Sequence, residues 1–91
     1  MTSGAGSDRL DAIRSRLTSA LHPLELEVTD ESHLHVGHEG ARDGRGHFHV
    51  RIVSSRFKGL TPIAQHRLVY AALGDLMTTD IHAVRITAIP C

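Results

Sequence analysis

The stretch from His47 to Tyr70, HFHVRIVSSRFKGLTPIAQHRLVY, constrains the fold of this 91-residue chain more than any other. Its first part alternates apolar and polar residues, a pattern typical of a half-buried strand. The apolar set is Phe48, Val50 and Ile52, and the polar set is His47, His49 and Arg51. We therefore expect a strand with one face in the core, onto which the rest of the chain packs.

The second part of this stretch predicts a turn and then a helix. Gly59, in Arg56-Phe57-Lys58-Gly59, allows a tight turn, and Phe57 is expected to anchor that turn in the core. Thr61 can cap a helix whose first turn suits Pro62. Helical spacing continues through Ile63, His66/Arg67, Val69/Tyr70 and Leu73.

The elements on either side follow the same periodicities. Ser7 or Asp8 can cap a helix with an apolar face of Leu10, Ile13, Leu17 and Leu21, ended by His22-Pro23. A strand is expected next, with Leu24, Leu26 and Val28 pointing inward. Thr29 to Gly46 is a long glycine-rich connection, and connections of this length are typically functional or mobile.

After the central helix, Leu76 to Asp80 reads as a polar stop. Ile81 to Ile89 then predicts a last strand, with Val84, Ile86 and Ala88 on one side and Ala83, Arg85 and Thr87 on the other. Two antiparallel strands followed by a crossover to a third predict an α+β fold with a three-stranded mixed sheet and helices packed on one face. We expect residues 1–7 to be disordered and residues 8–91 to form a single domain.

Composition restricts the function classes. Ten basic residues balance ten acidic ones, whereas nucleic-acid-binding domains are usually strongly basic. The one cysteine, Cys91, cannot form an intrachain disulfide, which fits a reducing compartment. No apolar run has the length of a membrane helix, and the first residues do not resemble a signal peptide. We expect a cytoplasmic protein with no membrane association.

Histidine is the unusual component, with eight residues of which five lie between His33 and His49. His33, His35 and His38 fall in the glycine-rich connection, and imidazole suits zinc, copper, nickel and iron. A self-contained structural zinc site commonly uses thiolates, which the interior of this chain lacks. His47 and His49 are interpreted as structural, and His66 as a core or boundary residue.

Three segments together resemble the BolA family: DESHLHVGH, the central stretch from His47 to Tyr70, and IHAVRI. Their order and spacing match from about Asp8 to Pro90. The resemblance implies an α-β-β-α-α-β layout similar to class II KH domains. One departure is Gln65, where the family usually has an arginine before the helical histidine.

The resemblance also implies a function. BolA proteins partner monothiol glutaredoxins and share a [2Fe–2S] cluster, with a cysteine and a glutathione thiol supplied from the glutaredoxin side. The BolA side supplies a histidine at the IHA position, here His82, and a histidine or cysteine in the loop after the first strand. His35 is the expected loop ligand, with His33 and His38 as alternatives. The isolated chain is expected to hold no cluster tightly and to be a monomer or weak homodimer.

Two other functions were weighed. A KH-like nucleic-acid-binding regulator of transcription, with DNA as its partner, would use Arg51, Arg56, Lys58 and Arg67 on phosphates. The balanced charge, the scarcity of aromatic residues and the lack of a G-x-x-G loop count against it. An enzyme is not expected, because the sequence shows no nucleophile with a base, no paired carboxylates and no phosphate loop.

Overall fold

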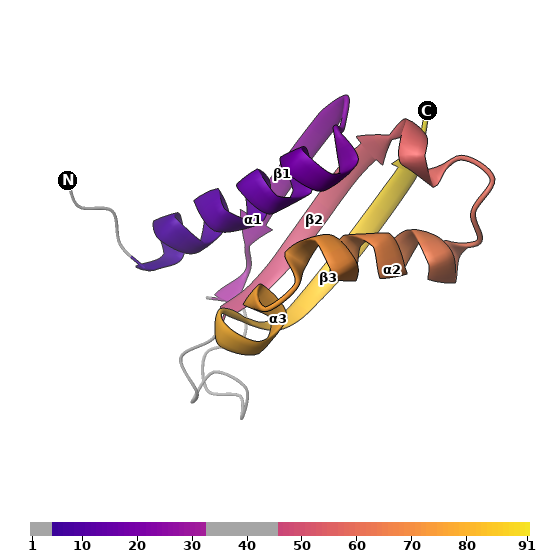
Figure 1. The fold of residues 1–91 in the computed structure, drawn as a ribbon. Helices are drawn as coiled ribbons and strands as arrows, with labels where there is room; N and C mark the ends of the chain where they lie inside the picture. Colours follow the sequence, from indigo (N-terminus) through magenta and orange to yellow (C-terminus); the bar gives the residue numbers. More distant parts are fainter. Residues whose placement is uncertain (1–4, 33–45) are drawn as a thin grey trace.

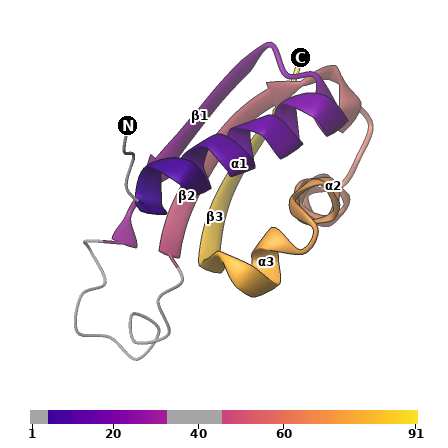
Figure 2. The same ribbon diagram turned by 60° about the vertical axis from the view of Figure 1, so that its left-hand side comes forward.

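The structure, a computed structural model, describes residues 5–32 and 46–91. Along the chain lie α1 (Ala5–Leu21), β1 (Glu25–Asp30), β2 (Gly46–Ser54), the 3₁₀ turn η3 (Ser55–Phe57), α2 (Pro62–Leu73), α3 (Leu76–Thr79) and β3 (Ile81–Pro90). Strand β2 is the centre of the sheet, antiparallel to β1 and parallel to β3. Figures 1 and 2 show the helices gathered on one face of this sheet. The predicted three-stranded mixed sheet with helices on one face is confirmed.

The alternation in β2 decides which face of the sheet is covered. Phe48, Val50 and Ile52 are almost completely buried against the helices. Their neighbours in the register, such as Val28 in β1 and Ile86 in β3, belong to the same face. The opposite face carries the polar residues of all three strands and has no helix over it (Figure 2).

The core lies between the sheet and the helices. Helix α1 contributes the face predicted from its spacing, with Ile13, Leu17 and Leu21 buried. Arg16, on the exposed side of α1, ties this helix to α2: its Nη1 donates a hydrogen bond to the Leu73 carbonyl at 3.0 Å. A cation is favourable there, because the last carbonyls of a helix lack partners within the helix.

The turn between β2 and α2 forms as its residues predict. Phe57 is fully buried, and Gly59 has φ +76°, a conformation that L side chains rarely adopt. Thr61 caps α2, because its Oγ1 accepts a hydrogen bond from the N–H of Ala64 at 3.1 Å. Pro62 occupies the first turn, where its missing N–H costs nothing.

Three expectations need correction. Helix α1 begins at Ala5, before the predicted cap at Ser7 or Asp8, so 5–7 belong to the helix, while residues 1–4 lie outside the described residues. Leu24 is 75% exposed rather than inward, because pairing with β2 starts at Glu25 and Leu24 lies in the bend before the strand. The expected polar stop is a short helix, α3, that buries Leu76.

Helix α2 presents its apolar residues in two directions. Val69 and Leu73 are buried in the core, whereas Ile63 is 65% exposed and Tyr70 is 42% exposed. The helical spacing identified the helix correctly, but it did not separate the residues of the core face from those of the outer face.

Candidate functional site

His82 lies at the start of β3, next to α3. The register pairs Gly46 with Ile81 and then His47 with Ala83, so His82 is an extra residue at an irregularity of the ladder. Bulges of this kind re-aim a side chain away from regular pairing. Ile81 is fully buried and anchors the strand, while His82 is exposed. The buried Ile81 therefore fixes the backbone of the strand beside His82, whose imidazole is exposed at the surface.

The structure brings His47 beside His82. The two ring centroids are 5.1 Å apart and the ring planes are tilted by 50°. His47 is half-buried, and its Nε2 atom is shielded from solvent. The sequence interpretation left His47 as structural and did not pair these residues, because they meet only through the parallel register of β2 and β3.

The two ends of the histidine-containing connection lie at this same site. The N–H of His47 donates to Ser32 Oγ at 3.1 Å, and the N–H of Glu31 donates to the His47 carbonyl at 2.7 Å. The N–H of Gly46 donates to the carbonyl of Asp80 at 2.9 Å. Ser32 and Gly46, the described residues on either side of 33–45, are thus hydrogen-bonded to His47 and to Asp80, and Asp80 lies two residues before His82.

His33, His35 and His38 lie outside the described residues, so all three remain open as the expected loop ligand. Within residues 5–32 and 46–91, no group of three or more His, Cys, Asp or Glu side chains could hold a metal ion. His82 and His47 are therefore not a closed site. A metal centre here requires further ligands from the connection or from another molecule.

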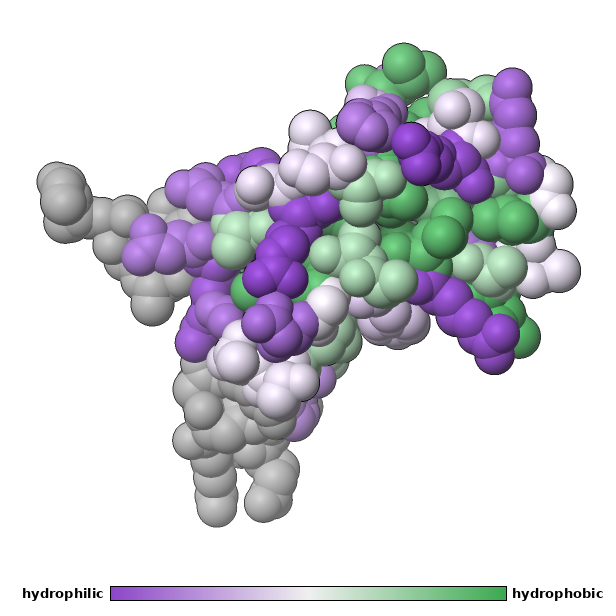
Figure 3. Space-filling view, in the orientation of Figure 1, coloured by the Kyte–Doolittle hydropathy of each residue, from purple (hydrophilic) through white to green (hydrophobic). Residues whose placement is uncertain are grey.

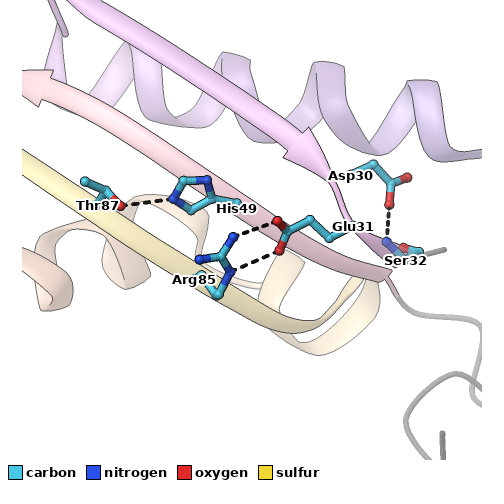
Figure 4. Close-up of polar contacts among 6 residues, drawn as sticks. All are labelled: Asp30, Glu31, Ser32, His49, Arg85 and Thr87. Carbon is cyan, nitrogen blue, oxygen red and sulfur yellow. Dashed lines mark hydrogen bonds and ion pairs between the residues drawn. The ribbon is translucent and has the colours of Figure 1, made fainter. Parts of the chain in front are cut away.

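Polar contacts fix the base of the connection, as Figure 4 shows. Arg85 in β3 reaches the carboxylate of Glu31 with two donors, Nη2 to Oε2 at 2.7 Å and Nε to Oε1 at 3.1 Å. The Asp30 side chain accepts the N–H of Ser32 at 2.8 Å. The Glu31 hydrogen bond and charge raise the pKa of the Arg85 guanidinium, so the donor side of this pair stays charged at ordinary pH values.

The candidate phosphate-binding residues do not form one surface. Arg51 lies on the open sheet face, where its guanidinium contacts Glu25 at 2.9 Å and has its pKa raised by that hydrogen bond. Arg56, Lys58 and Arg67 are exposed on η3, the following turn and α2, which belong to the helical side. His66, between them, is half-buried on α2.

Comparison with known proteins agrees with this architecture. The model of the family described as BolA-like protein matches residues 17–90. BolA-like protein 1 of Bos taurus is 46% identical over 77 residues, covering 85% of this chain and 55% of that protein. Protein BOLA1, chloroplastic, of Arabidopsis thaliana is 39% identical over 89 residues, covering 94% of this chain and 56% of that protein. The chain thus spans about half the length of these curated relatives.

Solved structures show the same fold. The BolA domain of SufE1 from Arabidopsis thaliana has a TM-score of 0.79 at 39% identity, covering 98% of this chain and 95% of that chain. The solution structure of BolA1 from Mus musculus has a TM-score of 0.77 at 39% identity, covering 99% of this chain and 71% of that chain. Among the described residues, no helix has both the length and the apolar character to cross a membrane. The chain belongs to the BolA-like protein family.

Proposed function

We propose that this chain is a binding module that shares a [2Fe–2S] cluster with a monothiol glutaredoxin carrying glutathione. Its ligands in this proposal are His82 and a histidine of the connection, with His35 first and His33 and His38 as alternatives. The observation that supports it best is the placement of His82, an exposed imidazole at a strand irregularity beside both ends of the histidine-containing connection.

The donor set fits this cofactor. Neutral imidazole is an established ligand for iron–sulfur clusters, and two imidazoles on one iron raise the reduction potential of the cluster. Covalent geometry limits how far His35 can lie from Ser32, because three residues of chain span at most about 11 Å. Ser32 itself is described: its Oγ accepts a hydrogen bond from the backbone N–H of His47.

A site with two ligands from this chain is a half-site. The described residues offer no third His, Cys, Asp or Glu beside His82 and His47; in this proposal the connection supplies one further histidine and the partner supplies the remaining ligands. The proposal therefore makes the chain a binding protein rather than an enzyme. Because imidazole must be deprotonated to bind a metal, acidification is expected to weaken cluster binding.

His47 has a different role in the proposal. Its Nε2 is shielded from solvent and its ring packs on His82, so it orients the neighbouring imidazole instead of binding the cluster. His47→Phe keeps an aromatic ring and removes both nitrogens. This variant removes any ligation by His47 and keeps an aromatic ring beside His82.

The test is reconstitution of the full chain with a monothiol glutaredoxin, glutathione, iron and sulfide, followed by visible absorption and circular dichroism. We expect a heterodimer whose cluster spectrum differs from that of the glutaredoxin homodimer. His82→Ala should abolish this spectrum, as should alanine at one of His33, His35 or His38, and the position that does so identifies the loop ligand.

His22→Asn is the matched control. His22 is an exposed histidine just after α1 with φ +45°, a conformation that asparagine tolerates. This variant removes one imidazole away from His82 and should leave the spectrum unchanged. A heterodimer spectrum that persists in His82→Ala would overturn the proposal.

The compartment is also a proposal. We propose the cytoplasm, although the Arabidopsis relatives carry the names chloroplastic and chloroplastic/mitochondrial. Cell fractionation of the native protein tests this assignment.

A further inference from the structure

A second surface of the molecule lies on the outer side of α2. It carries Leu60, Ile63 and Tyr70, which are 37%, 65% and 42% exposed. Ile63, Arg67 and Tyr70 are spaced four and three residues apart, so they lie along one face of the helix. Figure 3 shows apolar surface over the part of the molecule where α2 lies, with hydrophilic side chains at its margin.

This apolar face is not needed by the core. The inward side of α2 already buries Val69 and Leu73, with Leu68 and Ala72 packed against them. A helix that is apolar on both sides is typical of one covered on both sides. Neighbouring exposed apolar residues rimmed by polar ones are a common feature of interaction sites on small soluble domains.

The charges around this face are of one sign. Residues 44–74 contain no Asp or Glu. Among the described residues, Arg56, Lys58 and Arg67 have no ion pair, whereas the other five described arginines each lie within 3.6 Å of a carboxylate. Asp75, the next acidic residue along the chain, is engaged by Arg16 at 2.9 Å. The unpaired cations of the described residues thus lie beside the exposed apolar residues, in a chain of balanced total charge.

Gln65 on α2 fixes the preceding turn, which carries Lys58 and Leu60, against the helix. Its Nε2 donates to the carbonyls of Phe57 at 3.2 Å and Leu60 at 3.3 Å, which fastens the turn onto α2. Phe57 is fully buried below the same turn. Lys58 and Leu60 are therefore placed beside the helix before any partner arrives, which reduces the entropy lost on binding.

We propose that Leu60, Ile63 and Tyr70, together with Lys58 and Arg67, form a docking surface for an acidic, amphipathic protein segment. The apolar side chains bury the apolar stripe of that segment, and its carboxylates meet the cations. This apolar–basic surface is separate from His82, and its occupancy does not depend on a cluster.

A second copy of the chain is a poor occupant. A two-fold contact through the same patch would place Arg67 and Lys58 of one copy near the same cations of the other. A nucleic-acid backbone fits less well too, because the described part of this surface offers three cations and aliphatic side chains occupy its middle. An acidic segment with apolar residues can bury the apolar side chains of the surface and pair with its cations.

The probe is a synthetic amphipathic helical peptide with leucines at helical spacing and glutamates between them. Its control is the same peptide with every glutamate replaced by lysine. Each is added to the isotope-labelled full chain, and backbone amide shifts are recorded by NMR. We expect shifts confined to residues 58–71 with the acidic peptide, smaller as salt rises, and none with the basic peptide.

Variants distinguish specific binding at this surface from non-specific hydrophobic binding. Ile63→Ser and Arg67→Glu should each lower the affinity for the acidic peptide at least about tenfold, because each substitution removes a contact at the centre of the surface. Leu24→Ser is the matched control, since Leu24 is an aliphatic residue outside the surface that is 75% exposed, against 65% for Ile63. Circular dichroism confirms that each variant is folded.

Two results would overturn the proposal. One is the absence of shifts at peptide concentrations up to about 1 mM, the weak end of specific association, or shifts away from α2 and its turn. The other is an oligonucleotide that displaces the peptide and binds more tightly through the same residues. The experiment uses no iron, sulfide or glutaredoxin, so its outcome is independent of the cluster proposal.

Discussion

The hydroxyl of Ser54 joins three elements of the fold. It lies at the end of β2 with no exposed surface. Its Oγ donates to the carbonyl of Leu21, the last residue of α1, at 2.7 Å and accepts the N–H of Arg56 in η3 at 3.1 Å. Both backbone groups are helix-end groups that lack a partner within their own helix. Removing this hydroxyl should therefore lower the free energy of unfolding by more than the loss of an average surface hydrogen bond would.

Ser54→Ala deletes both hydrogen bonds and leaves the two backbone groups beside a methyl group. A hydrogen bond contributes about 0.5–1.5 kcal/mol net, and a buried group without a partner costs about 1–3 kcal/mol. We expect the free energy of unfolding to fall by about 2–3 kcal/mol. A domain of this size loses about 4–8 °C of Tm per kcal/mol, so Tm should fall by roughly 10–20 °C.

Urea unfolding followed by circular dichroism measures this loss. The matched control is Ser19→Ala, because Ser19 is exposed on α1 and alanine favours the helix. The control should be neutral or slightly stabilising, and the m value should be unchanged in both variants. A loss in Ser54→Ala below about 0.5 kcal/mol would refute the reasoning, since it would mean that the hydroxyl contributes less than one ordinary hydrogen bond.

Three further predictions concern the turn and the base of the connection. Gly46→Ala should lower the free energy of unfolding by about 1–3 kcal/mol, because its Cβ would meet ring carbons of Phe48 at 2.6 and 2.7 Å; an unchanged urea midpoint would contradict this. Gly59→Ala should cost about 1–2 kcal/mol in the same assay although nothing lies within 4 Å, because its φ is +76°. Arg85→Gln should speed amide hydrogen exchange at Glu31. The Glu31 carboxylate raises the pKa of Arg85, so the charge contribution is complete below the unfolded pKa and is lost only as pH rises through the higher folded value. The difference in Tm between this variant and the unmodified chain should therefore be constant across neutral pH, and a difference that varies there would contradict the assignment.

Local patterns predicted most of the elements because their causes are local. Alternation in β2 depends on the two-residue repeat of a strand, and the cap at Thr61 depends on a hydroxyl three residues before the N–H it accepts. The positive φ of Gly59 and the burial of Phe57 also follow from the turn that these residues form.

The wrong predictions concern whether an apolar side chain faces the core or the solvent, which the local sequence pattern does not determine. Leu24 continues the alternation of β1, but it precedes the first paired residue and points to solvent. Ile63 and Tyr70 fit the helical repeat as well as Val69 and Leu73 do. The difference between the two sets is which side of α2 the sheet covers, and that depends on tertiary packing.

The sequence by itself determined the α+β class, the order of the three strands and two long helices and, through its family resemblance, the choice of His82 as a candidate ligand. Only the tertiary structure placed His47 against His82, because these residues are far apart in sequence and meet through the parallel pairing of β2 with β3. It also decided that the cations near α2 stay unpaired, while Arg9, Arg16, Arg51 and Arg85 find carboxylates outside their own elements. Periodicity acts between near neighbours along the chain, whereas sites and surfaces arise from residues that the fold brings together from distant positions.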